Sequence, residues 1–139
     1  ILKTDDELTS TINLLFDKYV ANDFELSDYY ADDVVARVNN QELNGYENLI
    51  TGFKAHHELL YNDISIDELY VHTNYFSNGE VWSNSWFTWS GVGKTTGEEY
   101  TNRAHFDYKW ENGKIVELLA YYSEYADLKE SAALQATQE

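Results

Sequence analysis

The spacing of apolar residues changes near residue 63, and this change restricts the possible folds more than any other feature of the chain. Before it, residues 8–20 and 46–60 carry apolar side chains at helical spacing. After it, apolar and polar residues alternate, which predicts four long β-strands at residues 64–76, 80–90, 99–110 and 114–125. Helices followed by consecutive strands indicate an α+β fold with an antiparallel sheet, not a doubly wound parallel one.

Short local signals place the turns and the smaller elements. Asn78-Gly79 and Asn112-Gly113 favour tight hairpins, because Asn and Gly tolerate a positive φ. Two capping boxes are predicted ahead of the helices, Thr4 with Glu7 and Asn44 with Glu47. We also expect a short second helix within residues 24–33, a strand at 34–38, and a frayed helical turn after residue 125. No repeat or linker interrupts the chain, so residues 1–139 are predicted to form one domain.

Composition excludes several classes of partner and chemistry. The net charge is −16, from 9 basic and 25 acidic residues, so we expect neither nucleic acid nor an anionic membrane surface as a partner. The chain has no cysteine, which excludes disulfides, thiolate nucleophiles and cysteine-based metal sites. No apolar run approaches the roughly 18 residues of a membrane-spanning helix. We expect a soluble domain, either cytoplasmic or exported after removal of a leader.

Two motifs suggest chemistry that their context argues against. The segment SGVGKTT resembles the end of a phosphate-binding loop, but Thr88 occupies the position of its first glycine and the segment joins two strands. His56 and His57 are adjacent on a predicted helix, so their side chains point about 100° apart and are poorly placed to bind one ion. One of them is expected to face the core and the other water. We therefore predict neither a metal site nor a cofactor.

One strand carries a polar face and an apolar face. The polar face consists of Arg103, His105, Asp107 and Lys109, and the apolar face of Ala104, Phe106, Tyr108 and Trp110. The polar face is either a solvated surface with cross-strand charge pairs or the wall of a pocket in which His105 does chemistry. The Cβ atoms of His105 and Asp107 are about 7 Å apart on a strand, which suits electrostatic tuning better than a direct hydrogen bond.

The preceding strand carries large aromatic residues on both faces. Trp82 and Trp86 share one face, while Phe87 and Trp89 share the other. Both faces are therefore expected to be covered. The covering is either core on one side with a dimer contact on the other, or an aromatic-walled ligand site, and the two are compatible.

Three segments resemble a known superfamily. YADD at 30–33, NGYENLITGF at 44–53 and ENGKIVELLAYYSEYADL at 111–128 resemble the nuclear transport factor 2-like proteins, especially SnoaL-like polyketide cyclases and ketosteroid isomerases. The resemblance implies a cone-shaped fold in which a strongly bent antiparallel sheet wraps helices around a deep pocket, commonly in dimers. It also implies that the concave face of the sheet, and with it His105, lines the pocket.

The resemblance implies roles for individual positions. His105 corresponds to the oxyanion-stabilising acid of the isomerases and to a histidine of the SnoaL-like cyclases. The isomerase base corresponds to Val38 and the cyclase acid/base aspartate to Ala120, neither of which can carry a proton. The isomerase tyrosine corresponds to Leu15, with Tyr19 one turn later. Both known chemistries therefore lose their principal proton carrier.

Three functions are left open at this point. The first is binding of a small, largely hydrophobic molecule in an aromatic pocket, with the ligand-binding candidates Tyr19, Trp82, Trp86, Arg103 and Tyr122. The second is an acid/base lyase, isomerase or cyclase acting on a polyketide- or steroid-like carbonyl compound, with His105 as proton carrier and Asp107 tuning it. The third is a non-catalytic dimerisation module. In each case we expect a homodimer that buries the apolar row from Ala104 to Trp110, or Val81, Phe87 and Trp89.

Overall fold

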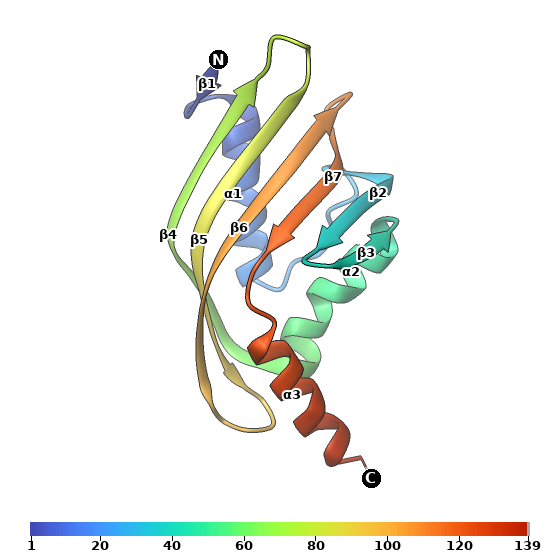
Figure 1. Ribbon diagram of the computed structural model, residues 1–139, viewed down its shortest axis with the longest axis vertical. Coiled ribbons are helices and arrows are strands. Elements are labelled where there is room, and N and C mark those ends of the chain that lie inside the picture. Colours follow the sequence, from blue (N-terminus) through green and yellow to red (C-terminus); the bar gives the residue numbers. More distant parts are fainter. Residues whose placement is uncertain (139) are drawn as a thin grey trace.

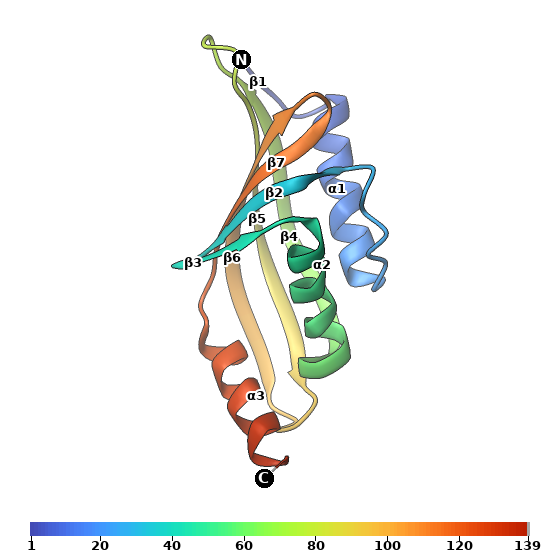
Figure 2. The same cartoon turned by 90° about the vertical axis from the view of Figure 1, so that its right-hand side faces the viewer.

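The computed structural model describes residues 1–138 and contains a seven-stranded sheet in the order β1-β4-β5-β6-β7-β2-β3 (Figure 1). The strands are β1 (Leu2–Lys3), β2 (Tyr30–Val38), β3 (Gln41–Asn44), β4 (Tyr61–Tyr75), β5 (Val81–Gly93), β6 (Glu99–Glu111) and β7 (Lys114–Tyr121). The helices are α1 (Glu7–Val20), α2 (Tyr46–Ala55), the single π-helical turn η1 (His56–Leu60) and α3 (Tyr125–Ala136). The sheet is curved, α1 and α2 lie on the same side of it, and α3 lies beside the end of the β5–β6 hairpin (Figure 2).

The α+β class and the four long antiparallel strands are confirmed, while the sheet as a whole is mixed. Strand β2 pairs in parallel with β7, with Ala36 opposite Leu118 and Val38 opposite Ala120. Turn signals specify direction only between strands joined by a hairpin. Because β2 and β7 come from opposite ends of the chain, their relative direction is set by tertiary packing.

Some local predictions also differ from the structure. The predicted helix within residues 24–33 does not form, because Leu26 and Tyr30 are drawn into the core and Tyr30 already begins β2. Neither capping box forms, since α1 follows Asp6 and α2 follows Gly45 without a side-chain cap. The C-terminal segment forms the 12-residue helix α3 instead of a frayed turn.

The core lies between the concave face of the sheet and the helices. Ile12 and Phe16 of α1 and Leu49 of α2 pack in one cluster with Phe87 and Leu118 of the sheet. No helix within residues 1–138 is long and apolar enough to cross a membrane.

The apolar row of β6 faces this interior. This corrects the prediction that the row is a dimer surface and the prediction that the polar face of the strand is the concave one. Ala104, Tyr108 and Trp110 are buried inside the single chain, and Phe106 packs against the same cluster. Strand β5 presents Phe87 and Trp89 to the same side. These residues are therefore not available as a dimer surface. Helix α1 needs an apolar partner, so the apolar face of the strand, and not the polar one, becomes the concave face.

Candidate functional site

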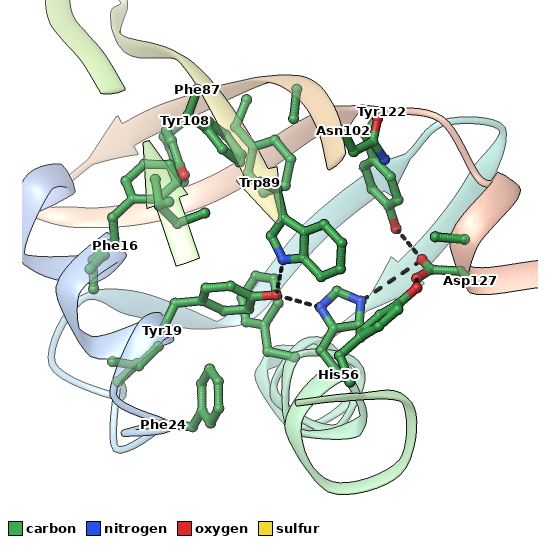
Figure 3. Close-up of a pocket in the computed structure, with 18 of the residues that line it drawn as sticks. Phe16, Tyr19, Phe24, His56, Phe87, Trp89, Asn102, Tyr108, Tyr122 and Asp127 are labelled. Carbon is green, nitrogen blue, oxygen red and sulfur yellow. Dashed lines mark hydrogen bonds and ion pairs between the residues drawn. The ribbon is translucent and has the colours of Figure 1, made fainter. Parts of the chain in front are cut away.

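A cavity of about 80 Å³ lies between α1, α2 with η1, and the concave face of the sheet, and α3 contributes to its wall (Figure 3). Most of its lining is apolar. The apolar lining includes Leu15, Phe16, Phe24, Phe53, Phe87 and Phe106. Polar side chains gather at one end, where the last turn of α1, the start of η1, strand β5 and helix α3 meet. The cavity therefore combines an apolar body with one polar end, as ligand pockets commonly do.

Tyr19, His56 and Trp89 form a hydrogen-bonded chain at this polar end. The Trp89 Nε1–H donates to the Tyr19 hydroxyl oxygen over 3.0 Å, and that oxygen lies 2.8 Å from His56 Nδ1. The indole N–H occupies the Tyr19 oxygen as an acceptor, and His56 Nδ1 is the acceptor within reach of the Tyr19 O–H, so we assign Tyr19 as the donor to Nδ1. The neutral imidazole then carries its proton on Nε2, on the side that faces α3.

Asp127 of α3 faces that side of the imidazole. Its Oδ2 atom lies 3.9 Å from His56 Nε2 and accepts a hydrogen bond from the Tyr122 hydroxyl over 3.3 Å. Its Oδ1 atom accepts a second hydrogen bond, from the Tyr61 hydroxyl. Two tyrosines thus hold the carboxylate beside the imidazole. An imidazole next to a carboxylate is a combination that enzymes use for proton transfer.

Burial sets the protonation states of the two central groups. Burial lowers the pKa of the His56 imidazole below its ordinary value, while Asp127 opposes the shift and His57 adds to it. Burial likewise raises the pKa of the Tyr19 phenol, with partial opposition from the Trp89 hydrogen bond. At neutral pH the imidazole is therefore uncharged and able to accept a proton, and the phenol is a hydrogen-bond donor.

The chain places His56 through a change of helix type. Helix α2 ends at Ala55 and the wider π-helical turn η1 begins at His56, which turns this ring toward the pocket. His57, one residue later, lies with its Nε2 atom 2.6 Å from the Tyr19 carbonyl oxygen and donates to it. The prediction that one histidine faces inward holds for His56, but the other bonds to the backbone of α1 and is only partly exposed.

Of the predicted ligand-binding residues, Tyr19 and Tyr122 lie in the pocket wall, and their contact with a ligand stays a prediction. Trp82, Trp86 and Arg103 are not among the lining residues. On strands β5 and β6 the residues next to them, Phe87, Asn102 and Ala104, line the cavity instead. Alternation along a strand then directs Trp86 and Arg103 to the other face.

The predicted catalytic pair is also on the convex face, so its expected inward orientation is wrong. The two neighbours of His105, Ala104 and Phe106, line the cavity, which directs His105 away from it. Its ring lies 4.6 Å from that of Trp86, and its Nε2 atom lies 2.8 Å from Asp107 Oδ1. The two side chains bend together, so the pair is closer than the strand spacing predicts. It does not reach the pocket.

Sequence reasoning missed His56, Trp89 and Asp127 as site residues. The sequence considers His56 only as a metal ligand, and it leaves Trp89 open as core, dimer contact or wall of an aromatic ligand site. Asp127 lies in a tail that was expected to fray. The positions aligned with the family's proton carriers, Val38 and Ala120, do not line the cavity. The signals in the sequence that point to this site are Tyr19 near the end of the first helix and Tyr122 after the last strand.

The family model described as SnoaL-like domain matches residues 15–118. The chain belongs to the SnoaL-like family. The resemblance noted in the sequence is thereby confirmed. Among curated proteins, none is significantly similar to this chain.

Solved structures of similar shape are numerous, and all those named here are distant in sequence. A candidate polyketide cyclase from Silicibacter sp. TM1040 is 19% identical with a TM-score of 0.72, over 88% of this chain and 93% of that one. A candidate isomerase from Bacillus subtilis is 12% identical with a TM-score of 0.71, over 89% of this chain and 91% of that one. An NTF2-like protein from Anabaena variabilis is 16% identical with a TM-score of 0.66, over 84% and 86%. At these identities the likeness concerns the fold, and the function must be argued from the site.

Proposed function

We propose that this SnoaL-like protein binds a small, largely apolar molecule that carries one carbonyl or hydroxyl oxygen, and that His56 transfers a proton on it. The observation that carries the proposal is the set of Tyr19, His56 and Asp127 at one end of a mostly apolar cavity. The acid/base chemistry on a carbonyl compound that the sequence suggested is thus kept in this proposal. The proton carrier is now His56 and no longer His105.

The volume of the cavity limits the ligand. At about 80 Å³ the cavity is smaller than the roughly 150 Å³ engineered cavity that admits benzene. A short branched chain suits it best, and a six-membered ring already requires the cavity to widen. A polycyclic steroid or polyketide requires the pocket to open.

The hydrogen bonds suggest how a ligand starts the reaction. A ligand oxygen near Tyr19 competes with His56 Nδ1 for the Tyr19 hydroxyl proton. When the hydroxyl turns to the ligand, Nδ1 loses its donor and becomes a free base. It then takes the proton from the carbon next to the carbonyl, and the negative charge that develops on the ligand oxygen is stabilised by Tyr19.

Asp127 supports the charged intermediate state. Once Nδ1 has taken a proton the imidazole is a cation, and the carboxylate facing its Nε2–H stabilises that charge. Return of the proton to another carbon of the ligand completes an isomerisation. Delivery of the proton to a departing hydroxyl, which leaves as water, completes a dehydration.

Exchange of α-protons measures the first step directly. We expect the protein to accelerate deuterium incorporation into 2-butanone and 3-penten-2-one in D₂O, followed by ¹H NMR. His56→Gln should slow this exchange by roughly a hundredfold or more, because a positioned acid/base contributes about 10²–10⁴-fold. His105→Gln is the matched control, since His105 lies on the convex face, and it should exchange at the wild-type rate.

The same experiment separates catalysis from simple binding. If the ketones shift the Trp89 indole resonance while the wild-type protein leaves their α-protons unexchanged, the pocket binds without acid/base chemistry. Equal loss of exchange in His56→Gln and His105→Gln would contradict the assignment of the proton carrier to His56.

A further inference from the structure

Helix α3 contacts the rest of the molecule through the buried Ala126, an ion pair from Lys129 to Glu98, and two carboxylates. Only Ala126 and Glu130 of this helix are buried, while Tyr125 and Leu128 are exposed. Among the buried polar side chains of residues 1–138, Glu130 is the one that carries a charge, and it is 1% exposed. A buried charge persists only where donors surround it, so its environment calls for an explanation.

The loop between β5 and β6 forms a fitted receptor for the Glu130 carboxylate. Oε1 accepts hydrogen bonds from the backbone N–H groups of Thr95 and Thr96, each over 3.3 Å. Oε2 accepts from the Thr96 hydroxyl over 2.5 Å and from the Tyr100 hydroxyl over 2.6 Å. This loop includes the end of the SGVGKTT segment, which resembles a phosphate-binding loop. The anion that it binds is the Glu130 carboxylate of the same chain.

Gly93 leaves the space that the carboxylate occupies. A Cβ atom at Gly93 would lie 2.3 Å from the Glu130 carboxyl carbon and from one of its oxygens. Burial raises the pKa of Glu130, but its hydrogen bonds from Thr96 and Tyr100 outweigh burial and leave that pKa below its ordinary value. The group is therefore an anion at neutral pH and matches the donors around it.

Asp127 and Glu130 are three residues apart on α3 and so lie on one face of the helix. Glu130 reaches the β5–β6 loop, and Asp127 reaches the polar end of the pocket, where Figure 3 shows it directed toward His56. The hydrogen bonds of Glu130 to the loop therefore fix the position of α3. The position of α3 in turn fixes that of the Asp127 carboxylate.

We propose that Glu130 is a positioning residue that, seated in the β5–β6 loop, holds α3 so that Asp127 faces His56 and water is kept from the pocket. Its role in turnover rests on the proposed function. Its effect on the environment of His56 does not, because that effect is measured without a substrate.

NMR titration of the imidazole protons of His56 measures its pKa. This pKa separates the effect of the position of α3 from the effect of the Asp127 charge. Asp127→Asn keeps the helix in place but removes the charge that raises the pKa of His56, so that pKa should fall further. Glu130→Ala should release α3 and admit water. Burial is the largest cause of the shift, so the pKa of His56 should rise toward its ordinary value of about 6.5. The two variants thus move the same pKa in opposite directions.

Chemical rescue tests whether the missing carboxylate itself is responsible. Glu130→Ala leaves a space that acetate matches in size and charge. Added acetate should return the pKa of His56 toward its wild-type value, whereas chloride at the same ionic strength should not. α-Proton exchange should fall at least about tenfold in Glu130→Ala and recover with acetate, because small misplacements of catalytic groups cost up to about 10²-fold. Gln135→Ala, an exposed position on α3, should behave as wild type.

Gly93→Ala provides an independent route to the same result. The added methyl group displaces the Glu130 carboxylate without removing it, so the pKa of His56 should rise as in Glu130→Ala. If Glu130→Ala does not fold, this variant decides the question. An unchanged pKa of His56 in a folded Glu130→Ala or Gly93→Ala protein would overturn the proposal and leave Glu130 with a purely structural role. If the pKa moves as stated but wild type exchanges no α-protons, positioning stands and the proposed catalysis fails.

Discussion

His56 shows how burial outweighs a neighbouring charge. A carboxylate 3.9 Å away favours the imidazolium, yet the pKa of His56 is lowered because the ring has lost its water. The same burial raises the pKa of Tyr19, so the two groups that share a hydrogen bond are pushed toward opposite roles. This separation into a base and a donor is what acid/base chemistry near neutral pH requires.

The lowered pKa of His56 predicts how folding stability depends on pH. Below about pH 6.5 the unfolded chain binds a proton on this residue that the folded protein does not bind. His56 therefore makes the free energy of unfolding decrease as the pH falls from 7.5 to 5, by at most about 1.4 kcal/mol per pH unit. His56→Gln lacks this contribution and should lose less stability over that range. Urea unfolding at a series of pH values measures it, and parallel profiles for the two proteins would contradict the assignment.

Among the elements, α1 is joined to the sheet by a buried chain of hydroxyl groups. The Trp110 Nε1–H donates to Ser83 over 2.8 Å, Ser83 lies 2.7 Å from Thr73, and Thr73 lies 2.8 Å from Thr9 of α1. Because the indole only donates, each hydroxyl in turn can donate to the next. The chain crosses from β6 through β5 and β4 to α1 at the end of the molecule away from α3 (Figure 1).

Cutting this chain in the middle should destabilise the protein. Thr73→Val keeps the shape of the side chain but leaves the Ser83 and Thr9 hydroxyls each short of a partner. We expect the free energy of unfolding to fall by about 1–3 kcal/mol, the usual cost of a buried polar group left unsatisfied. Thr101→Val is the control, because Thr101 is exposed and makes one long contact, 3.4 Å, with Ser90. Equal urea midpoints for the two variants would show that the chain does not stabilise the fold.

At the scale of the whole molecule, the convex face of the sheet carries the residues that sequence reasoning placed inside. Tyr70 pairs with Trp86, Trp86 with His105, and His105 with Tyr121, so one row crosses β4, β5, β6 and β7. The aromatic members are 68% (Tyr70), 46% (Trp86) and 50% (Tyr121) exposed. Exposed aromatic rows of this kind commonly mark protein interfaces.

The homodimer therefore stays a prediction, with its surface moved to this row. We expect light scattering at micromolar concentration to give a dimer, and Trp86→Asp to give a monomer whose pocket still binds ketones. Leu128→Asp, which adds the same charge at an exposed position on α3, should remain dimeric. A wild-type monomer would contradict the prediction. A dimer whose pocket binds nothing would instead favour the dimerisation module.

The sequence by itself determined the class of the fold and the grouping of residues on each strand. Helical and alternating periods are local, so residues 8–20 and the four long strands could be predicted from their own side chains. Alternation also separated Ala104 and Phe106 from His105 correctly. On β5, where both faces carry aromatic side chains, a period of two residues does not say which face is inside. On β6 the inward placement of His105 came from the family resemblance and not from the period.

The tertiary structure decided which face turned inward and which residues met at the site. Packing of the helices against the sheet made the apolar face of β6 the concave one, and His105 was left outside with Trp86. His56 and Asp127 lie far apart in the chain and face each other only because α3 packs beside η1. No local sequence pattern predicts this contact, because it depends on how two elements that are distant in the chain pack against each other.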